Sequence, residues 1–203
     1  MAKISTYETD GNPSLADKVI GTEVSSDNAT KNYLLSDIKS LMFGTFGVTQ
    51  VLNGVSTVNQ VPSGLDSALQ VSFGAAQYTS SDPVMIDAAG TVTFNQPGLY
   101  LLNAYGNVER KGSSGGAAIV LFRSLINDVQ AGSTKGFDVD KTDTFTPYEI
   151  TIPLNIATAG TTLKFQIMRD SSGVDAGGLY IHENLGGWSD VPSAEIGLWK
   201  IGS

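Results

Sequence analysis

Two segments of the chain carry apolar residues where a strand packed against one core would alternate apolar and polar side chains. They are residues 99–105 and residues 195–202. In the first, alternation puts Leu101 and Asn103 on one side of a strand and Leu102 on the other, and neither side is polar enough to face water. Such a strand needs a second burial surface beyond its own core. In a chain of 203 residues we expect that surface to be another subunit.

From about residue 65 onward, short alternating segments are separated by turn residues. The clearest is residues 148–156, where apolar side chains stand at every second position. Pro153 interrupts this segment, which predicts an edge strand or a bulge because proline cannot donate to a ladder. Several such segments predict a β-sandwich or barrel. The expected strands are residues 69–73, 91–94, 117–126, 148–156, 163–167 and 179–182.

The first third of the chain has a different texture. Residues 1–43 are polar and rich in turn signals, which predicts an extended arm. Within it, Ser36 is placed to cap one short helix with Ile38, Leu41 and Met42 on a single stripe. Residues 44–65 carry an apolar residue every three or four positions, which fits either an extended linker or a short trimeric stalk.

Composition narrows the function classes. Twenty-three glycines and only 16% charged residues favour an all-β protein. A net charge of -8 argues against nucleic-acid binding, which needs clustered Lys and Arg. Without cysteine there is neither a disulfide nor a thiolate metal site. We find no secretory leader and no apolar run long enough to enter a membrane, so we expect a soluble product made in a cytoplasm.

Candidate chemistry is sparse. His182 is the only histidine, and a strand over residues 179–182 would point it and Glu183 to opposite faces, so we expect a structural histidine. Asp138, Asp140 and Glu149 occupy calcium-loop positions, but no glycine stands where the sharp turn requires one. We therefore expect a solvated acidic loop, with these three residues as the ligands if a cation binds.

No cofactor is expected. The glycine-rich segments 112–116 and 131–136 do not match a phosphate-binding loop and are interpreted as flexible loops. No pair of carboxylates is set apart as in a glycosidase, so we expect no enzyme. Trp188 and Tyr180 are the aromatic residues that would contact a sugar if one binds.

Four motifs in the second part of the chain resemble the jelly roll of C1q heads and tumour-necrosis-factor-type ligands. They are the turn and strand at residues 96–100, the strand 148–154, the turn and strand at 159–165, and the terminal strand 196–201. Their order matches that family over residues 66–203. The resemblance implies a homotrimer about a threefold axis. It also implies that Leu101, Asn103, Thr151, Gly197, Trp199 and Ile201 face that axis.

The arm resembles the N-terminal segments of bacteriophage fibre and virion-appendage proteins, through residues 15–22 and 28–38. This resemblance implies that residues 1–43 attach the protein to a virion. The arm residues expected to make that attachment are Leu15, Val19, Tyr33, Leu34, Ile38 and Leu41.

Together these patterns predict a non-enzymatic, trimeric fibre or spike of a phage virion. Its head, residues 66–203, would project for host-surface binding, and its partners would be sister chains, capsid or tail proteins and a host-surface glycan. A head fibre or capsid decoration protein that stabilises the shell is the first alternative. A secreted C1q-type or tumour-necrosis-factor-type ligand is the second, opposed by the lack of a leader. A depolymerase is the third, opposed by the lack of a catalytic constellation.

Overall fold

The computed structural model describes residues 14, 16–23, 29–36, 38, 48–77, 82–112, 115–140, 145–183 and 186–202. The chain forms two compact units, Met1–Phe46 and Gly47–Ser203. We call them the arm and the head. In the described part of the chain, no helix is long and apolar enough to cross a membrane.

The arm contains a β-hairpin that the sequence analysis did not predict. Strands β1 (Lys18–Glu23) and β2 (Ala29–Leu34) pair antiparallel, with Val19 opposite Tyr33. β-branched residues such as Val19 and Ile20 favour the extended backbone, which explains a strand in a segment of polar appearance. An arm with one short helix as its only element is therefore corrected to an arm that also carries a hairpin.

The predicted helix of the arm is described only at its start. Leu35, Ser36 and Ile38 have helical backbone, so Ser36 lies inside the helical turn and does not precede it as a cap would. Leu15, Leu41 and Met42 lie outside the described residues.

The head is built from strands, eleven in the described ranges. They are β3 (Thr49–Ser56), β4 (Leu69–Gln70), β5 (Val84–Ile86), β6 (Val92–Phe94), β7 (Gly98–Arg110), β8 (Ala118–Ile126), β9 (Val129–Val139), β10 (Phe145–Ile156), β11 (Thr161–Arg169), β12 (Gly177–Leu179) and β13 (Ala194–Gly202).

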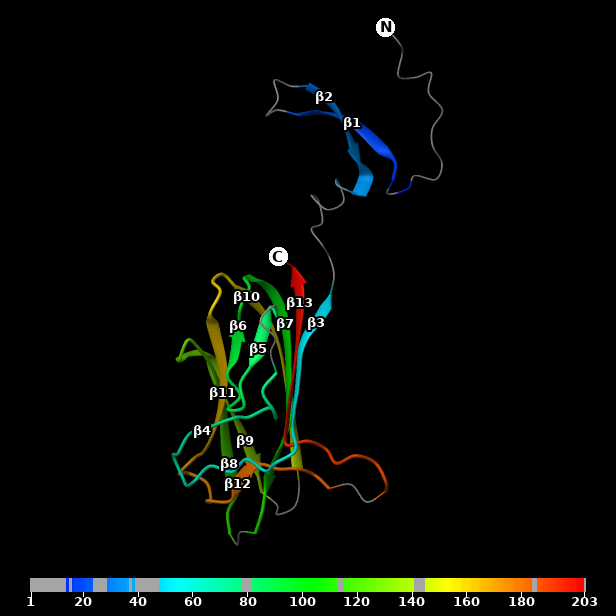
Figure 1. The fold of residues 1–203 in the computed structure, drawn as a ribbon. Helices are drawn as coiled ribbons and strands as arrows, with labels where there is room; N and C mark the ends of the chain where they lie inside the picture. Colours follow the sequence, from blue (N-terminus) through cyan, green and yellow to red (C-terminus); the bar gives the residue numbers. More distant parts are fainter. Residues whose placement is uncertain are drawn as a thin grey trace. The chain divides into compact units, whose positions relative to one another are not determined.

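These strands form two antiparallel sheets stacked face to face (Figure 1). Sheet I has the order β10-β7-β13-β3, with β12 beside β7, and sheet II has the order β5-β6-β11-β8-β9, with β4 beside β11. In sheet I, neighbouring strands are distant in sequence, since β7 lies between β10 and β13 and the chain crosses repeatedly from one sheet to the other, whereas β5–β6 and β8–β9 of sheet II are consecutive pairs. This arrangement is a jelly roll, and it confirms the predicted all-β jelly-roll class.

The core lies between the two sheets and is aromatic at its centre. Phe165 is fully buried, stacks on Phe122 with ring centroids 5.3 Å apart and meets the edge of Phe73 at 5.8 Å. From sheet I, Tyr100 and Leu102 point into this core with no exposed surface. The alternation predicted for residues 99–105 is therefore confirmed on its core side.

The predicted edge strand is confirmed as well. Residues 145–156 form β10, which is the last strand of sheet I, and Pro153 stands exposed on it opposite Leu101. An edge strand has one side without a ladder, so a missing amide donor is tolerated there. On the core side of the same strand, burial raises the pKa of the Tyr148 hydroxyl.

The prediction that residues 44–65 form a linker or stalk is wrong for 49–56. These residues are strand β3, which pairs with β13 along its length and buries Leu52 in the core. Burial alternates along this strand, with Leu52, Gly54 and Ser56 buried, but glycine and serine at two of the inward positions leave no apolar alternation in the sequence. Only the pairing with β13 distinguishes a strand from a linker or stalk at residues 49–56.

Two further predictions are corrected in the head. Residues 131–136 are not a flexible loop but part of β9, which pairs with β8. Their side chains are mostly exposed, so no apolar alternation marks the strand. The strand expected at 179–182 instead ends at Leu179, and His182 makes only an isolated bridge to Val191.

Candidate functional site

The face of sheet I that points away from the core carries the predicted contact residues. We call it the outer sheet face. Because paired residues of antiparallel strands stand on the same side of a sheet, the register aligns them in rows. The rows are Pro153, Leu101 and Trp199; Thr151, Asn103 and Gly197; and Glu149, Tyr105 and Glu195.

The first row is apolar across three neighbouring strands. Leu101 and Trp199 are only partly buried, and the adjoining Leu99 is 41% exposed. Single exposed apolar residues are ordinary on a protein surface, but a contiguous row on one sheet face is typical of an interaction surface. The outer sheet face therefore offers the second burial surface that the sequence pattern requires.

Trp199 lies flat on this face because its neighbour has no side chain. A Cβ atom added to Gly197 would stand 2.6 Å from Cη2 and 3.0 Å from Cζ3 of the Trp199 ring. The ring therefore covers Gly197, which is buried although it lies on the outer side of the sheet. Glycine at this position sets the orientation of the indole.

We expect Gly197→Ala to push the Trp199 indole off the sheet, because backbone lies beneath it and only the ring can move. Overpacking of this kind costs about 1–3 kcal/mol of unfolding free energy. Tryptophan fluorescence measures the change in the surroundings of the indole. The chain has two tryptophans, so the measurement is made in a Trp188→Phe background, where Trp199 is the remaining one. An emission spectrum identical to that of the parent would contradict the stacking.

The second row is polar and internally hydrogen-bonded. Asn103 Nδ2 donates to Glu149 Oε1 at 2.9 Å and to Thr151 Oγ1 at 3.1 Å. These bonds cross from β7 to β10 and hold the Glu149 carboxylate on the outer sheet face. Polar positions next to the apolar row fix orientation in an interface rather than supply its energy.

The three candidate cation ligands do not form a metal-binding group in the described part of the chain. Glu149 lies on β10 of sheet I, whereas Asp138 lies exposed on β9 of sheet II and Asp140 follows it. Nowhere in the described ranges do three or more His, Asp or Glu side chains gather in a way that would hold a metal ion.

The structure thus brings five of the six predicted axis residues together, namely Leu101, Asn103, Thr151, Gly197 and Trp199. Ile201 lies at a β-bulge, between Lys200 opposite Tyr100 and Gly202 opposite Leu99, and is partly buried. That these residues contact sister chains stays a prediction.

Comparison with known proteins gives likeness to solved structures but no family. No protein-family model matches the chain, and no curated protein matches it. Among solved structures, the chain is similar to Eiger TNF from S. frugiperda, with 17% identity and a TM-score of 0.38 over 72% of this chain and 92% of that chain. The jelly-roll assignment rests on the strand order and register given above.

A polar cavity lies at the far end of β7 and holds residues that the sequence analysis separated. It measures about 370 Å³, and His182 and Glu183 both line it. The prediction that they point to opposite faces assumed a strand over 179–182, and regular pairing ends at Leu179, so that alternation does not apply to them. Glu109 lines the same cavity and was missed. The sequence signal that could have identified Glu109 is a charged residue at an outward position of a long and mostly apolar strand.

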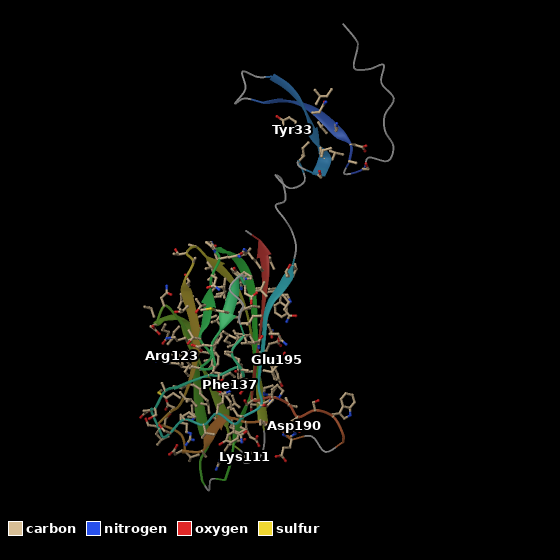
Figure 2. All side chains as sticks on the ribbon, in the orientation of Figure 1. Tyr33, Lys111, Arg123, Phe137, Asp190 and Glu195 are labelled. Carbon is tan, nitrogen blue, oxygen red and sulfur yellow. The ribbon has the colours of Figure 1, made fainter. Side chains whose placement is uncertain are left out.

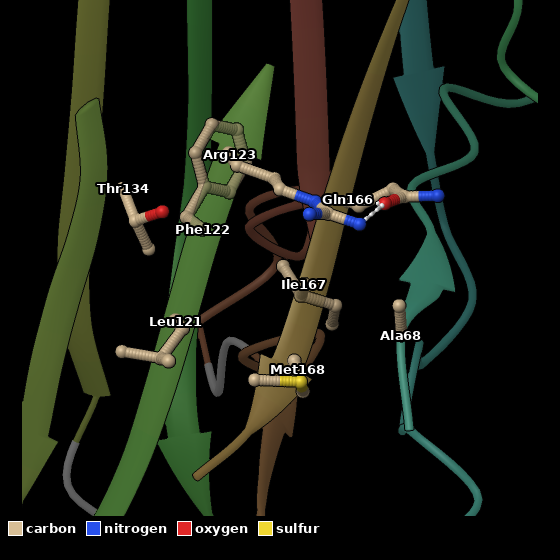
Figure 3. A pocket seen from close by; sticks show the side chains of 8 residues that line it. All are labelled: Ala68, Leu121, Phe122, Arg123, Thr134, Gln166, Ile167 and Met168. Carbon is tan, nitrogen blue, oxygen red and sulfur yellow. Dashed lines mark hydrogen bonds between the residues drawn. The ribbon is translucent and has the colours of Figure 1, made fainter. Parts of the chain in front are cut away.

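A smaller groove runs over the outer side of sheet II between β8, β9 and β11. It measures about 120 Å³ and is lined largely by Leu121, Ile167 and Met168 (Figure 3). Arg123 crosses it, donating from Nε and Nη2 to Gln166 Oε1 at 2.9 and 2.7 Å. Ligand cavities measure roughly 300–1,000 Å³, so this groove is too small to be one.

Proposed function

We propose that the protein is a non-enzymatic, homotrimeric structural protein of a bacteriophage virion. The arm attaches it to the particle, and the jelly-roll head is presented to the host surface. The apolar row on the outer sheet face carries the trimer part of this proposal. The resemblance of residues 15–22 and 28–38 to phage appendage proteins carries the virion part.

A second surface of the head complements the apolar row. Between the sheets, where the end strands β9 and β10 lie, a cavity of about 230 Å³ is lined by Phe122, Phe165, Ile150 and Ile152 among others. Ile150 and Ile152 are only partly buried. Contact between two unlike surfaces is heterologous, and heterologous contacts close into rings when the rotation allows it. A ring of three heads would cover both surfaces in every subunit.

The hairpin of the arm supports attachment to a partner. A two-stranded hairpin is marginally stable alone in water. This one exposes Val19 at 42% and Ile20 at 72% of their side-chain surface. Val19, Tyr33 and Leu34 are three of the residues proposed for attachment, and the register places Val19 opposite Tyr33. A particle surface that covers these apolar residues would stabilise the hairpin.

One observation favours the shell-bound form of this function, a head fibre or capsid decoration protein. The apolar spacing of residues 44–65 is compatible with a stalk, but residues 49–56 belong to sheet I. A receptor-binding tail fibre commonly needs a long shaft to reach its target, and the assignment of residues 49–56 to the head shortens the candidate shaft. Electron microscopy of virions with a labelled head distinguishes capsid from tail placement.

Deleting residues 1–43 is expected to leave a soluble, folded trimer that no longer joins virions, because the whole of β3 remains in the truncated chain. Incorporation is measured by blotting purified virions, and the oligomeric mass by light scattering. A chain that starts at residue 66 is the matched control. It lacks β3, so β13 loses one ladder and Leu52 leaves the core, and we expect misfolding. Normal incorporation of the first truncation would overturn the role of the arm.

A further inference from the structure

The polar cavity at the end of β7 has the composition of a ligand site. Its lining residues come from three separate segments and supply carboxylate, ammonium, imidazole and amide groups. They are Asn59, Glu109, Lys111, Ile181, His182 and Glu183. At about 370 Å³ the cavity falls within the size range of small-molecule sites. Glu109 lies eight residues along β7 from Leu101, about 26 Å at strand spacing, so the cavity is remote from the apolar row.

Glu109 is the feature that points to a ligand. Its side chain is 1% exposed, and Oε1 accepts a hydrogen bond from Lys111 Nζ at 2.5 Å. Oε2 is buried and has no hydrogen-bond partner. A buried carboxylate oxygen without a donor is costly, and such atoms are rare in folded proteins. A ligand hydroxyl that reaches Oε2 from the cavity would supply the missing donor.

The walls of the cavity are held by backbone hydrogen bonds. The Tyr180 amide donates to Asn107 O at 3.0 Å, and the Ile181 amide donates to Asn59 Oδ1 at 2.9 Å. His182 and Val191 exchange two backbone hydrogen bonds of 3.1 and 3.0 Å, which close the following loop at its base. The lining groups are therefore positioned before any ligand arrives, which lowers the entropic cost of binding.

The same loop carries Trp188, whose side chain is 77% exposed. It is the most exposed of the large apolar residues in the described ranges. Figure 2 shows Lys111 and Asp190 at the same end of the head, so the loop and the cavity share that end. An exposed aromatic ring and hydrogen-bonding groups at one end of the head match the two sides of a sugar, which has apolar C–H faces and a rim of hydroxyls.

We propose that this cavity binds a saccharide, whose hydroxyls donate to Glu109 and accept from Lys111 and Asn59 while its C–H face rests on Trp188. The proposal rests on the host-surface role proposed above and names the ligand class for it. Glu109 and Glu183 disfavour an anionic ligand. A metal ion is disfavoured because the described residues hold no group of three acid or histidine ligands.

The test measures binding of a panel of methyl glycosides to the full-length chain by saturation-transfer NMR and calorimetry. The panel covers hexoses, deoxyhexoses and N-acetylhexosamines. We expect one glycoside class to bind and Glu109→Gln to weaken it at least about tenfold, because the amide replaces one acceptor oxygen with a donor. Trp188→Ala, an exposed position that does not affect folding, is expected to weaken binding about as much. Asp128→Asn, which changes the carboxylate of an exposed ion pair with Lys164, is the matched control and should bind normally.

Each other outcome overturns the proposal. If no glycoside binds, or if both Glu109→Gln and Trp188→Ala bind as well as the parent, the cavity is not a saccharide site. If calcium chloride titrates into the cavity and glycosides do not, it is a cation site instead. None of these results touches the trimer or the arm, since light-scattering mass and virion incorporation are measured on the same variants.

Discussion

Leu101→Asp is expected to convert the proposed trimer into monomers or insoluble chains. Leu101 stands at the centre of the apolar row, between Pro153 and Trp199, on the middle strand of three. Burying the leucine contributes about 1.5–3 kcal/mol, and an unpaired carboxylate in its place adds a desolvation cost of several kcal/mol. Because the proposed trimer contains three copies of the chain, the free-energy losses of three substituted sites add up in each assembly.

Light scattering on the purified variant measures the mass, with a single chain at 21.3 kDa as the reference. Trp199→Asp should behave in the same way, since it occupies the same row. Val129→Asp is the control, because Val129 is apolar and 70% exposed on sheet II. A Leu101→Asp protein that keeps three times the chain mass would refute the assignment of this face to the trimer contact.

Phe165→Ala should produce the largest loss of stability among single core changes. Phe165 has no exposed surface, stacks on Phe122 of the same sheet and meets the edge of Phe73, and Phe122 in turn contacts Tyr148 of sheet I with ring centroids 5.0 Å apart. Removing a buried phenylalanine side chain costs about 3–5 kcal/mol, because the transfer energy is lost and the cavity closes only in part. Denaturant unfolding at a fixed protein concentration measures the difference, since an oligomer's apparent stability depends on concentration.

Trp188→Ala is the matched control for this prediction, because it also truncates an aromatic side chain. At 77% exposure Trp188 packs against little, so its loss should change the unfolding free energy by less than about 0.5 kcal/mol. Equal losses in the two variants would show that the stacked aromatic cluster does not stabilise the core.

The outer sheet face was predictable because it depends on one local rule. Alternation along residues 98–110 fixes which side chains share a side, and Leu101 and Asn103 fall together whatever strand lies next to them. The cavity was not predictable, because Glu109 and His182 are 73 positions apart and meet only through the pairing of β12 with β7. His182 was also assigned to a strand that does not exist, so its side was chosen by the wrong periodicity.

The sequence by itself determined the all-β class, the strand segments 99–105 and 148–156 that lie within β7 and β10, and the surplus of apolar surface on residues 99–105, since these follow from side-chain spacing within a few residues. Only the tertiary structure decided that 49–56 joins sheet I, that 129–139 is a strand and that Glu109 is buried beside His182. The physical reason is that strand pairing is a long-range choice. Backbone hydrogen bonds form between whichever strands the closed core brings together, and the side chains of one segment do not specify that partner.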